Sequence, residues 1–571
     1  MKSKVFRALL GYLCLSLNLY AQEPIQTHTY PKDMFWYPLD LPPSTAGSFG
    51  ELRPSHFHSG LDFKTNQRIG YPVHAANYGY VSRLRVQLAG FGNAVYLTHP
   101  GGYTTVYGHL DHLSPELAKA VRAYQQQHQS FEVDFKLDPF QFPVTKGQVI
   151  AWSGNTGGSA GPHLHFEIRD SATEQTINPQ LLGLTIPDHV PPTLNSITIY
   201  HLNGQPFSEK ILRQHLSITG AGGNYHLTQP QTLNLSGDVG FGITATDMNS
   251  TSFNRNGLYS LEMKLDGQTV YTFAVERFAF DQTHAINAYI DYPQFQLTRS
   301  MIQKCFILPG SHITIYPQSV NRGIMHFSDT LLHDVEYVVK DVAGNTSTLK
   351  LKVQASIMKD RPVFNPTGTL FHYNTPNDFS TDAVKVIVPV GNLYDDLDFN
   401  YATLPQKPGA YSATHRIHNK FTPLHEGFQL WIKPNSNIGR YADKAIIFNT
   451  VAGSVGGIYQ DGYVKAKPAS FGDFYVRIDT IAPVITPINI HNGSSMAGVR
   501  SITLKASDNL SGIKSYVGKI DGEWVLVEQD YKTRIYKHTF DDALAKGKHT
   551  FEFTVTDNKD NTKTYTAEFY R

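Results

Sequence analysis

The sequence has few cysteines, no surplus of either charge, and no long apolar run beyond its N-terminal segment. Two of its 571 residues are cysteine, and 49 Lys and Arg face 48 Asp and Glu. The chain therefore lacks the basic surface that nucleic-acid-binding proteins use, and we expect no nucleic-acid partner. No later apolar run approaches the ~20 residues of a transmembrane helix. The mature chain is expected to have no transmembrane segment.

The N-terminal segment is typical of a secretory signal. Three basic residues lie among the first seven, a mostly apolar stretch covers residues 8–20, and Ala21 precedes a polar residue. This order predicts a signal peptide over residues 1–21 and hence an exported protein. Cys14 lies inside that segment, so its removal leaves Cys305 alone and excludes an intrachain disulfide. Cys305 is interpreted as a buried structural cysteine.

The length predicts about four domains. A composition of 32 Tyr, 33 Phe, 45 Gly and 32 Pro favours strands and turns, so we expect a mostly β protein. An antiparallel-β domain is predicted over residues 22–186, with its core at about 45–183 and an insert at about 111–143. The insert contains a helix, with Ser114 as N-cap and Pro115 as the first helical residue. Three prolines make residues 187–192 a linker.

About three β-sandwich domains are predicted to follow, over residues 190–356, 357–480 and 481–571. The first and last share a weak repeat in which strand-like runs end in aspartate, at Asp247 and Asp341 and again at Asp508 and Asp557. Alternating strands that close in such turns resemble immunoglobulin-like domains. Turn chemistry accounts for the aspartates, and calcium binding is the alternative.

Two short patterns point to metal or proton-transfer chemistry. His58 and Asp62 are four residues apart, and Gly60 between them would let the chain bend so that both face one cation. His163 and His165 are separated by one residue in a strand-like run, which places both imidazoles on one face and turns the intervening Leu164 into the core. Paired histidines on one strand face are poor core residues unless each has a partner.

Further pieces surround these patterns in a fixed order. They are Gly70-Tyr-Pro-Val-His-Ala-Ala, Tyr107-Gly-His109, the strand and glycine loop from Lys146 to Gly157, and Ile177-Asn-Pro. Together with the histidine pairs, this set resembles the lysostaphin-like (LytM-type) zinc endopeptidase family, whose members cut peptidoglycan peptides. The resemblance runs roughly from Phe49 to Pro179 and implies an antiparallel-β metallopeptidase domain.

The resemblance implies specific roles. His58, Asp62 and His165 would hold one Zn²⁺, and His109 and His163 would be catalytic histidines that do not bind the metal. Two imidazoles and one carboxylate leave a fourth position open, as in catalytic zinc sites, where zinc lowers the pKa of water towards neutrality. Either His109 or His163 can serve as general base, since the pKa of histidine lies near the working pH. The insert is expected to shape or cover the cleft.

Other candidates carry less weight. Ser159 lies in a G-x-S-x-G pattern, but a strand-like run follows it where a serine hydrolase needs a helix. His425-Glu426 begins like a metalloprotease helix, yet Gln429 stands at the fifth position. His56 is the alternative to His58 as ligand. Tyr107 either contacts substrate or packs in the core.

The sequence thus predicts an exported zinc metalloendopeptidase that hydrolyses peptidoglycan stem or cross-link peptides, in the periplasm or outside the cell and associated with the wall. The alternative is a non-catalytic regulator of another wall hydrolase with the same fold. The β-sandwich domains would add contacts to the wall or to other proteins. Which peptide bond is cut, and whether residues 22–48 inhibit the site, stay open at this stage.

Overall fold

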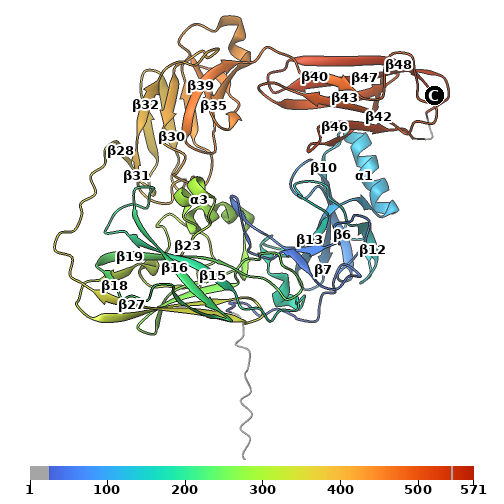
Figure 1. The fold of residues 1–571 in the computed structure, drawn as a ribbon. Coiled ribbons are helices and arrows are strands. Elements are labelled where there is room, and N and C mark those ends of the chain that lie inside the picture. Colours follow the sequence, from blue (N-terminus) through green and yellow to red (C-terminus); the bar gives the residue numbers. More distant parts are fainter. Residues whose placement is uncertain (1–24, 542–543) are drawn as a thin grey trace, which may run out of the picture.

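The computed structural model describes residues 25–541 and 544–571, so the predicted signal peptide lies outside the described residues. The chain forms four modules that follow one another around a ring-like path (Figure 1). The fold is mostly β, as the composition predicts. Within the described ranges, no helix combines the length and the hydropathy needed to cross a membrane.

The N-terminal module is built on one antiparallel sheet. Its main path runs in the order β1-β4-β13-β8-β7-β6-β10. These strands are β1 (Thr45–Gly47), β4 (Leu61–Lys64), β13 (His163–Asp170), β8 (Tyr103–Leu110), β7 (Asn93–His99), β6 (Gly79–Val86) and β10 (Val133–Lys136). A second, three-stranded sheet consists of β5 (Pro72–His74), β12 (Val149–Trp152) and β9 (His112–Leu113). A short hairpin pairs β2 (Leu52–Arg53) with β3 (His56–Phe57).

Strand β13 shows the expected alternation. Leu164 and Phe166 are fully buried in the hydrophobic core, while His163 and His165 face the opposite side, as the period of two requires. Gly60 precedes β4 and packs closely against β13. A Cβ at this position would lie 2.3 Å from the carbonyl oxygen of Phe166. Gly60 is therefore needed because two backbones approach each other here.

The predicted insert contains the helix α1 (Pro115–His128), with Ser114 at the N-cap and Pro115 in the first turn. The Ser114 side chain makes no capping hydrogen bond. After the helix, β10 pairs with β6 at the sheet edge opposite β1. The helix and β10 therefore lie at the end of the sheet away from β4 and β13, the strands that carry Asp62 and His165.

The second module contains a twelve-stranded sheet. Its longer strands are β15 (Thr193–His201), β16 (Leu212–Ala221), β19 (Gly237–Thr246), β20 (Ser260–Leu265), β21 (Gln268–Ala274), β26 (Leu332–Lys340) and β27 (Thr346–Ala355), and its helices are α2 (Ile286–Tyr289) and α3 (Tyr292–Thr298). Strand β14 (Thr176–Ile177) of the first module pairs with β22 (Arg277–Phe278) of the second. The two modules also share one continuous hydrophobic core, so they pack as a single unit.

The third and fourth modules each have their own hydrophobic core and two sheets. The third is formed chiefly by β29 (Asn377–Ser380), β30 (Val384–Val388), β34 (Gln429–Ile432), β38 (Tyr463–Ala466), β32 (Tyr401–Leu404), β33 (Thr414–Ile417), β35 (Ala445–Asn449) and β39 (Gly472–Ile478). The fourth is formed chiefly by β40 (Val484–Pro487), β42 (Ser501–Ser507), β43 (Ile513–Ile520), β46 (Ile535–Thr539), β47 (Lys548–Asp557) and β48 (Thr562–Tyr570).

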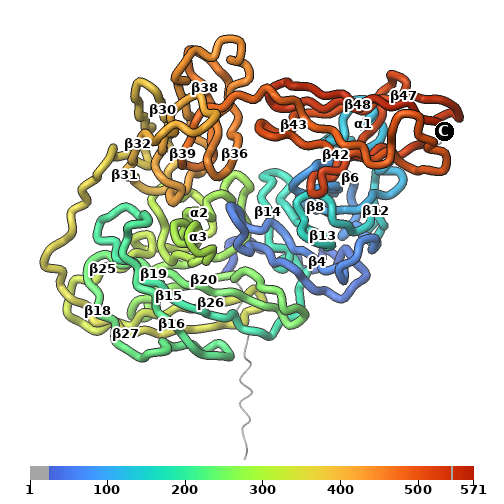
Figure 2. Tube along the Cα trace, turned by 45° about the horizontal axis from the view of Figure 1, so that its top comes forward, coloured from blue at the N-terminus to red at the C-terminus, as the bar shows by residue number. Residues whose placement is uncertain are grey.

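The fourth module returns to the first and closes the ring. It lies beside α1 in both views (Figures 1 and 2). A 2.8 Å hydrogen bond from Lys532 Nζ to the carbonyl oxygen of Asn155 joins the fourth module to the first. The N-terminal module is therefore flanked by the second module on one side and by the fourth on another.

Candidate metal centre

Side chains from two distant parts of the sequence meet at one buried point of the N-terminal module. His58 lies in the loop before β4, Asp62 lies on β4, and His165 is directly opposite Asp62 on β13. His58 Nε2 is 3.0 Å from Asp62 Oδ1, His165 Nδ1 is 2.9 Å from the same oxygen, and the two imidazole nitrogens are 3.1 Å apart. These three donor atoms form a group that could hold one metal ion.

Backbone carbonyl groups orient three of the imidazoles at this centre. The Nδ1 atoms of His58, His109 and His163 lie 2.7, 2.8 and 2.8 Å from the carbonyl oxygens of Ser48, Thr156 and Gly161. A carbonyl oxygen accepts only, so each Nδ1 carries the proton and each Nε2 keeps its lone pair. The inward-facing nitrogen of these three rings is thus set by the fold.

His165 is oriented through its other ring nitrogen, Nε2. Its Nε2 is 2.9 Å from Glu167 Oε1, which leaves Nδ1 to face Asp62. Glu167 is itself fully buried and accepts a 2.7 Å hydrogen bond from Arg169 Nε. A carboxylate behind a histidine fixes its tautomer and raises its basicity, which favours metal binding.

His109 and His163 lie beside this group. Their ring centroids are 4.7 Å apart, and His163 Nε2 is 3.3 Å from Asp62 Oδ1. His109, the last residue but one of β8, adopts a left-handed conformation with φ 59°, a strained backbone geometry that recurs at functional sites. The structure therefore brings together all five residues that the sequence singled out.

Two functional contacts escaped the sequence analysis. Arg53 donates a 2.7 Å hydrogen bond to Asp62 Oδ2, which leaves Oδ1 for the histidines. Glu167 supports His165 as described. Glu167 stands two residues after His165 and so shares its strand face, a signal that could have identified it. Nothing in the local sequence connects Arg53 with Asp62.

Without a metal, the charged groups of the centre compensate one another. Burial alone would raise the pKa of Asp62, but the surrounding histidines hold it well below its usual value. Burial likewise opposes protonation of His165, yet hydrogen bonds to Asp62 and Glu167 raise its pKa to about 9. Burial and the neighbouring imidazoles lower the pKa of His109 to about 3, so this ring is neutral near pH 7.

The remaining candidates lie elsewhere or act differently. His56 is exposed and bonded to the carbonyl oxygen of Pro54, outside the metal-binding group. Tyr107 is fully buried, and its hydroxyl accepts from the backbone of Ala76, so it is a core residue. The Ser159 hydroxyl donates to the carbonyl oxygen of Gly161 in a turn without a following helix. His425 lies outside any helix, at the boundary of β-rich modules.

Comparison with known proteins identifies the region of the chain that carries these residues. The sequence model described as "Peptidase family M23" matches residues 56–127 and 138–179, which include all five site residues. The chain contains a peptidase family M23 domain. A second match, to a Zu5-like domain, covers residues 368–479, which is most of the third module.

Relatives of the M23 domain align over limited segments. An uncharacterized metalloprotease of Haemophilus influenzae is 34% identical over 168 residues, covering 28% of this chain and 29% of the relative. The DD-carboxypeptidase/endopeptidase Mpg of Neisseria meningitidis is 33% identical over 137 residues, covering 24% and 25%. The chain thus spans less than a third of these relatives. The catalytic domain of lysostaphin from Staphylococcus simulans is 25% identical, with 24% of this chain and 90% of that chain covered and a TM-score of 0.18.

Proposed function

We propose that the protein is an exported zinc metalloendopeptidase that hydrolyses peptide bonds in the stem or cross-link peptides of peptidoglycan. The observation that carries the proposal is the convergence of His58 Nε2, Asp62 Oδ1 and His165 Nδ1, with two further histidines beside them. The Neisseria relative, named as a DD-carboxypeptidase/endopeptidase, supports the substrate class.

The donor set fits zinc. Nitrogen and carboxylate ligands at about 2.0–2.1 Å in tetrahedral geometry lie roughly 3.3 Å apart. The three donor atoms here are separated by 2.9–3.1 Å, so a small expansion admits the ion. When bound, zinc supplies a Lewis acid and lowers the pKa of water towards neutrality.

The chain's own residues then move the protons. His109 and His163 each present a free Nε2, held in place by the carbonyl groups of Thr156 and Gly161. One imidazole accepts the proton of the attacking water at its Nε2, and the imidazolium so formed can stabilise the oxyanion and pass that proton to the leaving amine. The ring centroids of His109 and His163 lie 4.7 Å apart, so both rings are available at the same centre.

Hydrolysis of purified muropeptides of known cross-link type tests the proposal. We expect cleavage by the chain without its first 21 residues, its loss on chelation, and its recovery with zinc. His58→Ala and His165→Ala should lose both zinc and activity, whereas His109→Ala should keep zinc and lose activity. His56→Ala, two residues from His58 but outside the metal-binding group, is the matched control and should behave like the wild type.

Two results would overturn the proposal. Cleavage that is indifferent to chelation, or that survives His165→Ala, would show that the metal group is not the catalyst. A chain that binds zinc but cuts none of the muropeptides would instead favour a regulator of another wall hydrolase. Mass spectrometry of the products identifies the bond that is cut.

A further inference from the structure

A second group of acidic side chains lies at the junction of the first two modules. Asp188 belongs to the proline-rich linker, and Asp247 and Asp341 follow the ends of β19 and β26. One carboxylate oxygen from each lies within 4.8 Å of the other two. Residues from a linker and from two strands that are far apart in the sequence are thus brought to one point.

Turn chemistry explains two of these carboxylates. Asp341 accepts hydrogen bonds from the backbone and side-chain nitrogens of Asn345, at 2.9 and 2.7 Å. Asp188 accepts a 2.9 Å hydrogen bond from the backbone of Val190. These are the local contacts that aspartate makes in turns.

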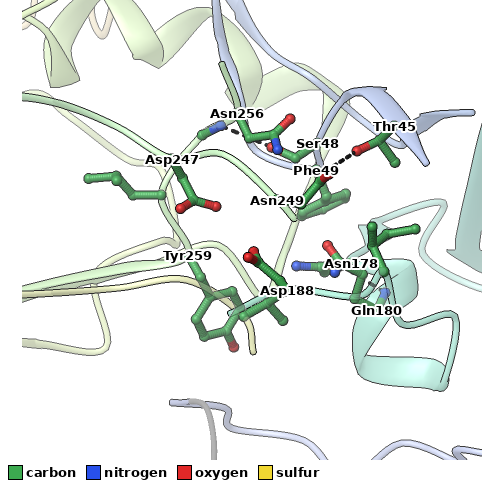
Figure 3. A pocket seen from close by; sticks show the side chains of 14 residues that line it. Thr45, Ser48, Phe49, Asn178, Gln180, Asp188, Asp247, Asn249, Asn256 and Tyr259 are labelled. Atoms are coloured by element: carbon green, nitrogen blue, oxygen red, sulfur yellow. Dashed lines mark hydrogen bonds between the residues drawn. The ribbon is translucent and has the colours of Figure 1, made fainter. Parts of the chain in front are cut away.

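Asp247 has no such explanation. It is 5% exposed, and its Oδ1 is buried without a hydrogen-bond partner. In Figure 3 the carboxyl groups of Asp247 and Asp188 point towards each other across a small pocket. A buried, unpaired carboxylate oxygen is expensive, because neither water nor a donor replaces its hydration.

The charges around Asp247 make this cost larger. Within the described residues, none of the three aspartates forms an ion pair with a lysine or arginine. Burial together with the negative charges of Asp341 and Asp188 raises the pKa of Asp247 to about 9. His189 partly offsets the negative charge of Asp188, and a bound cation would offset the charge of the group further.

A comparable group of three aspartates in the fourth module has a lysine beside it. Asp479, Asp508 and Asp557 also place their carboxylate oxygens within 4.8 Å of one another. Lys559, which neighbours this trio, donates its backbone N–H to Asp557. Burial lowers the pKa of the Lys559 amine, and the negative charge of Asp479 raises it. The fourth module therefore has a cation of its own nearby.

We infer that Asp188, Asp247 and Asp341 bind a calcium ion in the pocket between the first two modules. The pocket has a volume of about 30 Å³ and is lined by Asp188 and Asp247 together with Asn249 and Asn256. Asp341 lies beside it, with a carboxylate oxygen within 4.8 Å of those of the other two aspartates. Carboxylate and amide oxygens are the ligands of hard cations, and calcium accepts irregular geometry with oxygens at about 2.3–2.6 Å. A single calcium ion can therefore span this group.

A short series of hydrogen bonds connects the pocket to the metal centre. Asn249 Nδ2 donates to Thr45 Oγ1 at 2.8 Å, and the backbone of Gly257 donates to Ser48 Oγ at 2.9 Å. The carbonyl oxygen of Ser48 accepts from His58 Nδ1. Calcium would thus hold the linker and the second module against the segment that orients His58.

Calcium binding is measured directly, by equilibrium dialysis of the zinc-loaded chain with radioactive calcium after calcium has been removed with a selective chelator. We expect Asp247→Asn to lose one bound calcium per chain. Asp378→Asn, which changes an exposed aspartate of the third module, is the matched control and should bind as the wild type does. No peptidase activity enters this measurement, so it stands apart from the proposed function.

Thermal unfolding separates a calcium site from a merely structural cluster. Without calcium, Asp247→Asn should melt near the wild-type temperature at pH 7, because the raised pKa leaves Asp247 mostly protonated there. With calcium, the wild type should gain stability and the variant should not. Equal calcium binding by the two chains would overturn the inference. So would a wild type with the same melting temperature in the presence and in the absence of calcium.

Discussion

At the scale of single residues, the metal centre depends on which partner holds each imidazole. Backbone carbonyl groups fix the protons of His58, His109 and His163, whereas a buried carboxylate fixes that of His165. The difference matters because a carboxylate raises the basicity of a ligand histidine more than a neutral carbonyl does. Glu167 is therefore expected to raise the affinity of the centre for a metal without being a ligand itself.

Replacing Glu167 tests this role. Glu167→Gln keeps the shape of the side chain but removes the charge behind His165, and we expect zinc affinity to fall by about 10–100-fold. Competition with a chromophoric chelator measures the dissociation constant. Glu174→Gln is the control, since Glu174 is exposed and also contacts Arg169, at 3.2 Å. An unchanged zinc affinity in a folded Glu167→Gln chain would contradict the prediction.

At the scale of elements, the helix of the insert ends in a strained residue. Gln129, the C-cap of α1, adopts φ 48° and ψ 45°. This left-handed conformation is usual for glycine, which has no Cβ to clash with the backbone. The insert as a whole extends the sheet edge through β10 and places α1 next to the fourth module.

A glycine at this cap should stabilise the insert. For Gln129→Gly we expect a gain of about 0.5–1 kcal/mol in the free energy of unfolding, because the strain is relieved. Gln127→Gly, an exposed change inside the same helix, should instead cost about 1 kcal/mol. Urea unfolding of the two variants measures both effects. A loss of stability in Gln129→Gly would show that the left-handed turn is not strained.

At the scale of the whole molecule, the fourth module reaches the loop that orients a catalytic candidate. Lys532 donates to the carbonyl oxygen of Asn155, and the carbonyl group of the next residue, Thr156, holds His109. The ring of modules thus closes against the N-terminal module (Figure 2). The fourth module is expected to restrain this loop.

Removing the Lys532 contact should loosen the loop. An exposed charged hydrogen bond contributes about 0.5–1 kcal/mol, so Lys532→Ala should raise amide hydrogen exchange of residues 154–157 by about two- to five-fold. Lys514→Ala is the control, because Lys514 pairs with Asp560 inside its own module. Mass spectrometry after deuterium labelling measures both. Identical exchange in the two variants would contradict a restraining contact.

The sequence by itself determined what is local. The alternation in His163–Phe166 defines a strand face, Pro115 marks the start of a helix, and ordered short patterns identify the M23 domain. These features follow from backbone geometry and from spacing of a few residues, which a single sequence displays directly. The five candidate residues were found this way, although their roles as ligands and proton carriers stay proposals.

Only the tertiary structure decided which distant groups meet. His58 and His165 are 107 residues apart, and the contact of Lys532 with Asn155 spans 377. The Arg53–Asp62 pair, the carbonyl partners of the histidines and the aspartates around Asp247 likewise depend on the packing of strands and modules. No local pattern encodes these contacts, because their energy comes from burial and hydrogen bonding that exist only once the sheets have assembled.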